Sequence, residues 1–230
     1  MSCRESVKAT VKVTLTGPDG KVLKVIEGEK PDPFGYSVLN FMLFHIGASV
    51  SSSILFDPIG HEYYYDLVTP SPSTSLGYLV FGFCLANCPN AGFSPPNGIG
   101  MWLFNEVPGV DYTDDWAFYR FLSEWPSNLI TGLSYSPLSV SPGISSPSSP
   151  GDIVYYLLYA TQSITNTLSS PVNVYTIAFV GAVYGSRSAS PVYVPITFYV
   201  FTPPIVLSPG VTMTVSVTLS FPYGIAIGPS

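Results

Sequence analysis

Hydrophobic and polar residues alternate strictly near the carboxyl end of the chain. Every second residue from Val211 to Phe221 is apolar, and the residues between them are all serine or threonine. This period of two is typical of an antiparallel strand with one buried and one solvent-facing side. Three further strands are expected at 153–166, 172–183 and 192–201, separated by loops rich in Ser, Pro and Gly. Their regular spacing favours an antiparallel β-sandwich or jelly roll.

The first 30 residues show the same alternation and predict a charged hairpin. Apolar residues alternate with polar ones over 7–15, Gly-Pro-Asp-Gly at 17–20 is a strong turn signal, and a return strand runs to residue 27. The next segment, FGYSVLNFMLFHIGA, has its apolar residues at helical spacing, which predicts one short N-terminal helix.

The middle of the chain is less regular. Strands are expected at 61–68, 76–85 and 99–106. The low-complexity segment 134–151, SYSPLSVSPGISSPSSPG, is expected to be an exposed loop because it can bury little apolar area. The strands on both sides of it fit one pattern, so residues 1–230 are expected to form a single β-sandwich domain.

Charged residues are scarce and unevenly placed. They make up 10% of the chain, whereas about 25% is usual, and six of the eight cations precede residue 31: Arg4, Lys8, Lys12, Lys21, Lys24 and Lys30. The β body therefore offers no basic face to a phosphate backbone, and we expect it to bind no nucleic acid. Lys8, Lys12, Lys21 and Lys24 are candidates for docking a partner. The alternative is an ordinary edge hairpin whose lysines prevent unwanted strand pairing.

The sequence predicts neither a secretory signal nor a membrane-spanning helix. The amino terminus has no apolar run after its charges, so we do not expect a secretory signal. The longest apolar stretches, 38–50 and 76–86, are shorter than the about 20 residues that a membrane-spanning helix needs.

Three cysteines, Cys3, Cys84 and Cys88, leave two interpretations open. Cys84 and Cys88 end an apolar stretch, LVFGFCLANCP, which fits two buried thiols. A local disulfide between them is the alternative, which the geometry would decide. A metal site is disfavoured because neither histidine is near in the sequence and four ligands cannot be assembled.

Signatures of catalysis are nearly absent. His45 lies between apolar residues of the predicted helix, and the His61–Glu62 pair has no third partner. The acidic residues of DYTDD, at 111–115, fit the first turn of a helix better than a calcium site. We expect no enzyme and no cofactor. The aromatic residues Tyr112, Trp116, Tyr119 and Trp125 are expected in the core and a subunit interface, and the alternative is a surface that stacks against a glycan.

The surface chemistry indicates a harsh external setting. Acid denaturation acts mainly through carboxylates, which are few here, and proline-rich loops suit heat tolerance. Without an export signal, such a chain is expected to be made in a host cytoplasm and exposed outside it as part of a virion.

Both ends of the chain carry a resemblance. Its residues are the opening VKVTLTGPDGKVLKVIEG followed by GYSVLNFMLF, and the closing ITNTLSSPVNVYTIAFVGAVYG and VPITFYVFTPPIVLSPGVTMTVSVTLSF. This layout is similar to capsid, turret and tail β-sandwich proteins of hyperthermophilic archaeal viruses. The resemblance covers about half of the chain and transfers no catalytic residue.

The resemblance implies a structural virion protein that assembles with itself or with other coat proteins into a shell, a vertex or a tail. One alternative is a host-attachment module that binds surface glycans. Another is an extracellular pilus or filament subunit that receives a donated strand.

Overall fold

The protein is described by a computed structural model over residues 7–31, 53–56, 62–65, 79–80, 83–85, 92, 94–95, 98–106, 129–184 and 191–225. The regular elements in these ranges are all β-strands, and the pairings between named strands are all antiparallel. The predicted all-β antiparallel fold is therefore confirmed for this part of the chain. The helix predicted at 34–48 lies outside the described residues.

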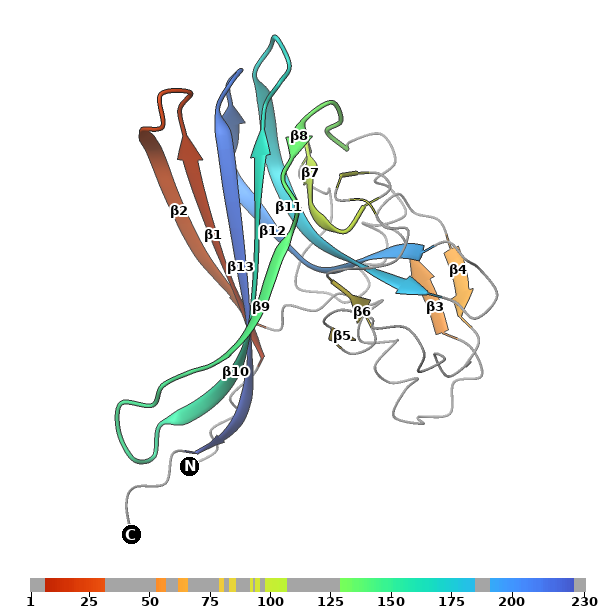
Figure 1. Ribbon diagram of the computed structural model, residues 1–230. Coiled ribbons are helices and arrows are strands. Elements are labelled where there is room, and N and C mark those ends of the chain that lie inside the picture. Colours follow the sequence, from red (N-terminus) through yellow and green to blue (C-terminus); the bar gives the residue numbers. More distant parts are fainter. Residues whose placement is uncertain are drawn as a thin grey trace.

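The first sheet has six strands in the order β2-β1-β13-β10-β8, with β9 also pairing with β10 (Figure 1). Its strands are β1 (Lys8–Thr16), β2 (Val22–Pro31), β8 (Ser134–Tyr135), β9 (Ser139–Ile144), β10 (Ile153–Thr165) and β13 (Thr212–Ile225). β1 pairs with β13 from Lys8 opposite Ser220 to Thr16 opposite Thr212. Strands from the two ends of the chain thus lie side by side at the centre of this sheet.

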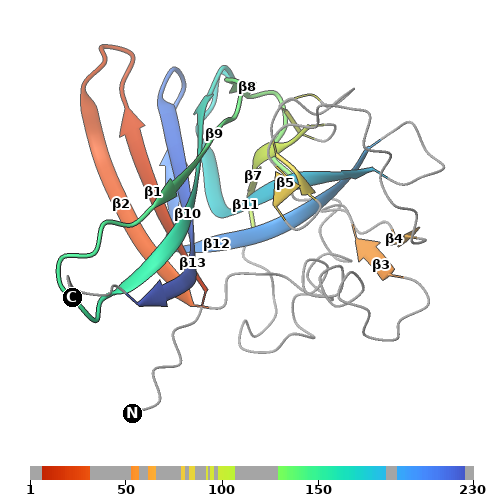
Figure 2. The ribbon, with the colours of Figure 1, turned by 60° about the horizontal axis from the view of Figure 1, so that its bottom comes forward.

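The second sheet has the order β12-β11-β6-β5, and β7 also pairs with β11. Its strands are β5 (Leu79–Val80), β6 (Phe83–Cys84), β7 (Gly100–Phe104), β11 (Val172–Tyr184) and β12 (Pro191–Leu207), and β3 (Ser53–Phe56) and β4 (Glu62–Tyr65) form a separate pair. In Figures 1 and 2, β11 and β12 curve away from the first sheet towards β3 and β4. The pairing register of β11 with β12 shifts at two places, between Val174 and Thr176 and between Phe179 and Val180. Such bulges bend a strand pair.

The amino-terminal hairpin forms as predicted. Pro18 and Asp19 occupy the central positions of the turn, the Gly20 N–H donates to the Gly17 carbonyl at 2.9 Å, and the Asp19 carboxylate accepts from the Lys21 N–H at 3.1 Å. Gly20 has a φ of +79°, a left-handed conformation that glycine adopts without steric cost. The turn chemistry of the sequence therefore explains where β1 ends and β2 begins.

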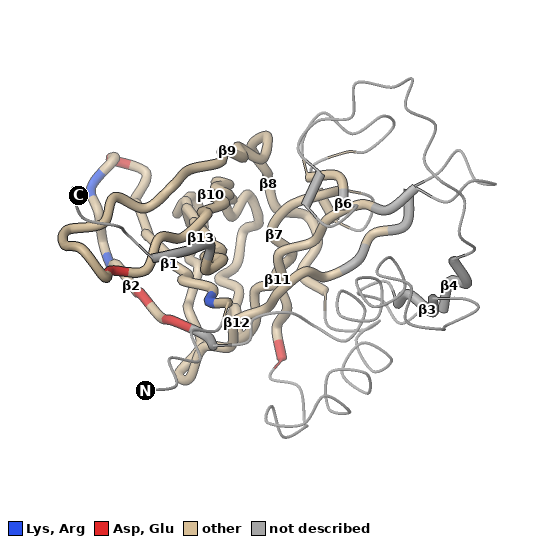
Figure 3. Tube along the Cα trace, turned by 90° about the horizontal axis from the view of Figure 1, so that it is seen from below, with Lys and Arg blue, Asp and Glu red and all other residues tan. Residues whose placement is uncertain are grey.

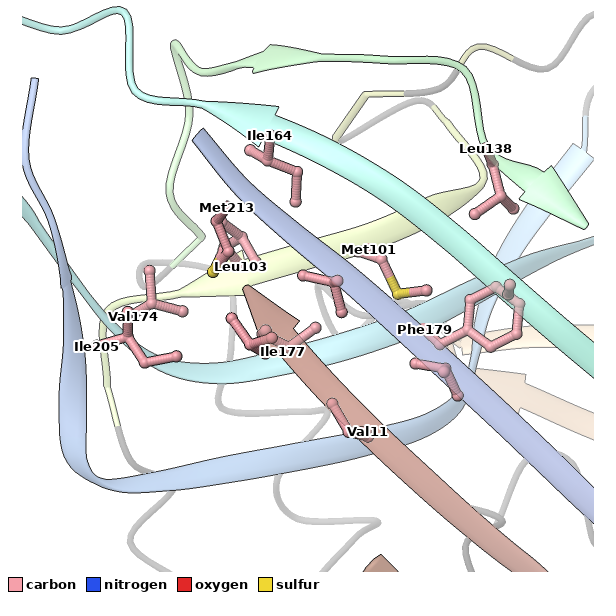
Figure 4. Close-up of a cluster of buried hydrophobic side chains, with 14 of the residues drawn as sticks. Val11, Met101, Leu103, Leu138, Ile164, Val174, Ile177, Phe179, Ile205 and Met213 are labelled. Atoms are coloured by element: carbon pink, nitrogen blue, oxygen red, sulfur yellow. The ribbon is translucent and has the colours of Figure 1, made fainter. Parts of the chain in front are cut away.

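One hydrophobic cluster joins the two sheets (Figure 4). The first sheet contributes the inward residues of β1, β10 and β13, and the second sheet contributes those of β7, β11 and β12. Labelled members are Val11, Ile164 and Met213 from the first sheet and Met101, Leu103, Val174, Ile177, Phe179 and Ile205 from the second. Burial of each large apolar side chain contributes about 1.5–3 kcal/mol, so this shared cluster is the main force that holds the sheets together.

The two sheets differ in how many of their faces are buried. The second sheet has another buried cluster, made of Trp102, Phe104, Ala178, Val180 and Phe198, whose residues alternate along β7 and β11 with those of the shared cluster. This burial on both sides explains why β11 has a nearly continuous apolar run, as strands covered on both faces do. β13 is buried on one side only, and its strict alternation follows from that.

The Asn166 side chain links the two chain connections that pass between the sheets, from β10 to β11 and from β12 to β13. It is fully buried and follows β10, just before the chain enters β11. Its Nδ2 donates to the carbonyls of Ser170 (3.0 Å) and Leu207 (2.8 Å), and its Oδ1 accepts from the Leu168 N–H at 2.9 Å. Leu207 is the last residue of β12. One side chain therefore fixes the β10–β11 connection against the start of the β12–β13 connection.

Tyr135 carries a buried hydroxyl with no hydrogen-bond partner among the described residues. Burial raises the pKa of this hydroxyl, and burial also raises that of Tyr193, where a hydrogen bond with the Gly92 backbone acts in the opposite direction. The pKa of a tyrosine in the unfolded chain is about 10. Because the pKa of each of these tyrosines is higher in the folded chain, their contribution to stability is complete below about pH 10 and is lost as the pH rises above it.

We therefore expect Tyr135→Phe to raise the pH at which the protein unfolds in alkali. At neutral pH the change should be neutral or stabilising by about 1 kcal/mol, because the lost hydroxyl is buried without a partner. Circular dichroism between pH 7 and pH 12 measures both effects, with the exposed Tyr159→Phe as the control. A clear loss of stability at pH 7 would contradict the expectation.

Two sequence-based predictions of local structure are wrong. The segment 134–151 is exposed over most of its length, but it is not simply a loop, because β8 and β9 within it pair with β10. An edge strand forms through backbone hydrogen bonds and needs little apolar burial. The single strand predicted at 76–85 is instead two short strands, β5 and β6, that pair with each other in an antiparallel hairpin.

Candidate interaction surface

Serine and threonine predominate on the outer side of the first sheet, which on β1 also carries Lys8 and Lys12 and on β10 Tyr159. We name this surface the hydroxyl face, and its residues alternate with the core residues of three neighbouring strands. They are Thr10, Thr14 and Thr16 of β1, Thr161, Ser163 and Thr165 of β10, and Thr212, Thr214, Ser216, Thr218 and Ser220 of β13. All of them are half-buried, as expected for short side chains on an open sheet face.

The hydroxyls of β10 and β13 form a ladder of cross-strand hydrogen bonds. Thr165 is opposite Thr212, Ser163 is opposite Thr214, and Thr161 is opposite Ser216, with Oγ–Oγ distances of 2.9, 3.0 and 3.0 Å. A hydroxyl has one donor and two acceptor sites, so each pair keeps acceptor capacity for a further partner. Because every second residue of a strand points to the same face and the rise is about 3.4 Å per residue, successive hydroxyl pairs follow one another along the strands at intervals of roughly 7 Å.

Charge is concentrated on the hairpin at one side of this sheet. β9, β10 and β13 contain no charged residue, whereas Lys, Asp and Glu residues lie along β1, β2 and the turn between them (Figure 3). Lys12 Nζ lies 2.6 Å from Glu27 Oε1, and Lys8 Nζ lies 3.5 Å from Glu29 Oε1. Both pairs are solvent-exposed, and such pairs contribute about 0–1 kcal/mol. Two of the four predicted docking lysines are thus engaged within the hairpin itself.

The other two lysines lie beside exposed aliphatic side chains. Val22, Leu23 and Val25 are 54%, 56% and 49% exposed, and Lys21 and Lys24 are exposed among them. No ion pair is recorded for Lys21 or Lys24 within the part of the chain that the structure describes. We name residues 21–25 the hairpin tip. It combines apolar area and positive charge at an edge of the first sheet.

The hairpin is held against the second sheet at Gly28. A Cβ at this position would overlap the Tyr199 hydroxyl of β12, so glycine allows the Tyr199 ring to lie over the β2 backbone. Tyr199 also contacts Phe201, with ring centroids 5.1 Å apart. This packing fixes the base of the hairpin, so that the hairpin tip extends from an anchored strand.

The other predicted site residues have separate outcomes. Cys84 is buried and disulfide-bonded, but Cys3 and Cys88 lie outside the described residues, so the Cys84–Cys88 pairing stays a prediction. Tyr112, Trp116, Tyr119 and Trp125 also lie outside the described residues, as do His45, His61 and the segment 111–115. Within the described ranges there is no group of three or more His, Cys, Asp or Glu residues that could hold a metal ion.

Two buried polar side chains, Gln162 and Asn166, are not among the site residues predicted from the sequence. Both lie in the strand expected at 153–166, with Asn166 at its end. Gln162 is 1% exposed, accepts from the Met101 N–H at 2.7 Å and donates to the Ser136 carbonyl at 2.9 Å. It therefore bridges the first sheet to β7 of the second. The burial of Gln162 could have been predicted from its position in the alternating pattern, because it lies on the same inward-facing side of β10 as Ala160 and Ile164.

Comparison with known proteins adds no assignment, because no family model, curated protein or solved structure matches the chain. Over the described residues, no helix is long and apolar enough to cross a membrane.

Proposed function

We propose that this protein is a structural component of a virus particle, assembled through contacts with copies of itself or with other coat proteins. The observation that carries the proposal is the first sheet, where the hydroxyl face, uncharged on β10 and β13, lies beside one charged and apolar hairpin tip. The resemblance of both chain ends to virion β-sandwich proteins supports the same role. Electron microscopy and sedimentation of the purified protein test it, and a chain that stays monomeric at high concentration would contradict it.

We also propose that the two sheets form a β-sandwich with jelly-roll connectivity. β10 pairs with β13, and β11 and β12, which lie between them in the sequence, pair with each other in the second sheet. This nested arrangement, in which one strand pair continues into another across the core, is expected of a double-sheet jelly roll. The shared hydrophobic cluster supplies the packing that such a sandwich requires.

The hydroxyl face suits repeated contacts between subunits. Short Ser and Thr side chains lose less conformational entropy on burial than long charged ones do. No charge has to be removed from water when the faces of β10 and β13 are covered, and desolvating an ion costs several kcal/mol. Hydroxyl contacts also keep their charge state in acid, so an assembly built from them would tolerate low pH.

The edge strands favour contacts through faces over exchange of strands. β2 carries Lys24, with Lys21 directly before its first residue, and has a register shift against β1 between Leu15 and Thr16. β9 contains Pro142, and β12 contains Pro195, Pro203 and Pro204. Lysine, proline and bulges at sheet edges all oppose pairing with another chain. We therefore place the strand-donating filament subunit below the coat protein as a candidate function.

The hairpin tip gives a specific test of assembly. Lys21→Gln combined with Lys24→Gln should weaken assembly at low salt several-fold, because these lysines are the exposed cations beside the apolar tip. The matched control is Lys8→Gln with Lys12→Gln, which removes the same charge from lysines that already pair with Glu29 and Glu27. Sedimentation velocity at several salt concentrations provides the measurement.

Equal effects from the two double variants would show that only net charge matters and that the tip has no docking role. Raised salt should weaken wild-type assembly and reduce the difference between the variants, because the Debye length falls from about 10 Å at 0.1 M to about 3 Å at 1 M.

A further inference from the structure

The loop between β9 and β10 presents serine hydroxyls that the fold itself does not use. It spans residues 145–152, with the sequence Ser-Ser-Pro-Ser-Ser-Pro-Gly-Asp, and lies at the end of the projecting β9–β10 ribbon (Figure 1). Ser146, Ser148 and Ser149 are exposed. No hydrogen bond of their hydroxyl groups is recorded within the described residues, although the Ser148 and Ser149 backbones are bonded.

The loop is held in a defined shape. Asp152 Oδ2 accepts from the Ser148 N–H at 2.8 Å and the Ser149 N–H at 2.7 Å, and the Asp152 N–H donates to the Ser149 carbonyl at 3.2 Å. The Ser145 Oγ accepts from the Tyr155 N–H at 2.8 Å. Backbone contacts thus fix the loop while the hydroxyls of Ser146 and Ser148 stay accessible.

An open hollow of about 490 Å³ adjoins these hydroxyls, and its lining includes Ser146, Ser148, Asp152 and Tyr155. Sites for small molecules are typically about 300–1,000 Å³. A carboxylate that can accept hydrogen bonds and an aromatic side chain are the groups that a sugar ring meets in such a site. Ser149 does not line the hollow.

We propose that Ser146 and Ser148 are O-glycosylated, and that the first sugar of each attached glycan lies in this hollow or at its rim. Exposed segments rich in Ser and Pro are typical acceptors of O-linked sugars. In the reaction, the serine Oγ attacks the anomeric carbon of a nucleotide sugar, the bond from that carbon to the phosphate breaks, and the nucleoside diphosphate leaves as the serine proton is lost. A glycosyltransferase of the producing cell would supply the catalysis.

A neutral sugar fits this loop better than a phosphate group. A phosphate would add about −1.5 to −2 charges beside Asp152. The chain has no Lys or Arg between Arg120 and Arg187, so nearby sequence supplies no cation to pair with it. A sugar adds hydroxyls to a surface that already depends on hydroxyls for its contact with water.

Mass spectrometry of the protein isolated from the cells or particles that naturally produce it tests the proposal. Trypsin would leave residues 121–187 as one peptide, so cleavage after Leu138 and Tyr155 by chymotrypsin is needed to isolate the loop. We expect sugar mass increments at Ser146 and Ser148, with sugar fragment ions and no loss of phosphoric acid. The increments should disappear in Ser146→Ala/Ser148→Ala and remain in the control Ser149→Ala, both produced in the same host.

Unmodified Ser146 and Ser148, phosphate in place of sugar, or sugar on Ser149 alone would each overturn the proposal. The wild-type map decides the question even if the double variant fails to fold. The result is separable from the proposed assembly role, because an unmodified loop would leave the hairpin-tip experiments unaffected.

Discussion

Replacing Asn166 with aspartate is expected to lower the free energy of unfolding by about 3–5 kcal/mol, although the two side chains have nearly the same size. The Asn166 amide donates to two backbone carbonyls, those of Ser170 and Leu207. A carboxylate would instead place negative oxygens against both carbonyls at a fully buried position. Both connections between the sheets would loosen together, because this one side chain joins them.

The effect of Asn166→Asp should depend on pH. Burial beside carbonyl oxygens raises the pKa of the introduced carboxyl above its unfolded value of about 3.9. The deficit should therefore be smallest in acid, where the protonated carboxyl can donate one hydrogen bond, and should grow as the pH rises through the folded pKa. Urea titrations at pH 3 and pH 7 measure this difference.

Asn173→Asp is the matched control, because Asn173 is exposed on β11 and the same chemical change there removes no buried bond. We expect it to change stability by less than about 0.5 kcal/mol. If Asn166→Asp were equally mild at pH 7, the crossings between the sheets would not depend on the Asn166 amide.

Replacing Gly100 with alanine is expected to cost about 3–5 kcal/mol through two separate effects. Gly100 has a φ of +136°, which side chains rarely adopt, and a Cβ there would overlap Gln162 Oε1. Moving Gln162 would break its bond from the Met101 N–H and leave that buried donor unpaired. Denaturant titration, with the slope monitored to confirm two-state unfolding, gives the cost.

Gly151→Ala separates the two effects, because Gly151 also has a positive φ, of +94°, but nothing lies within 4 Å of a Cβ there. It should show the backbone strain alone, about 1–2 kcal/mol. In a Gln162→Ala background, Gly100→Ala should cost clearly less than in the wild type, since the overlapping atoms are gone. Equal costs in both backgrounds would show that Gly100 and Gln162 are not coupled.

Strands with one buried and one solvent-exposed face were the most predictable part of the fold. β1 and β13 alternate because only one side is buried, and both the register of apolar residues and the turn at 17–20 follow from the sequence. β9 was missed because an exposed edge strand has no apolar periodicity to reveal it. β11 was predicted as a strand, but its continuous apolar run does not indicate which residues face which cluster.

The candidate surface could be predicted only in part. The sequence shows that the cations gather in the hairpin, but not which of them are paired. A bulge between Leu15 and Thr16 places Lys12 opposite Glu27; without it, the turn would place Lys12 opposite Ile26. Nothing in the sequence marks that bulge, so the division into paired lysines and exposed lysines required the structure.

The pairing of β1 with β13 has a consequence for biosynthesis. The inward residues of β1, including Val11 and Val13, leave the ribosome about 200 residues before their partners on β13. At about 5–20 residues per second, the hairpin waits roughly 10–40 s with its apolar side uncovered. Most of the cations of the chain lie in this waiting segment, where they would keep the nascent hairpin in solution. The uneven distribution of charge thus also protects the hairpin during the time before β13 is synthesised and pairs with it.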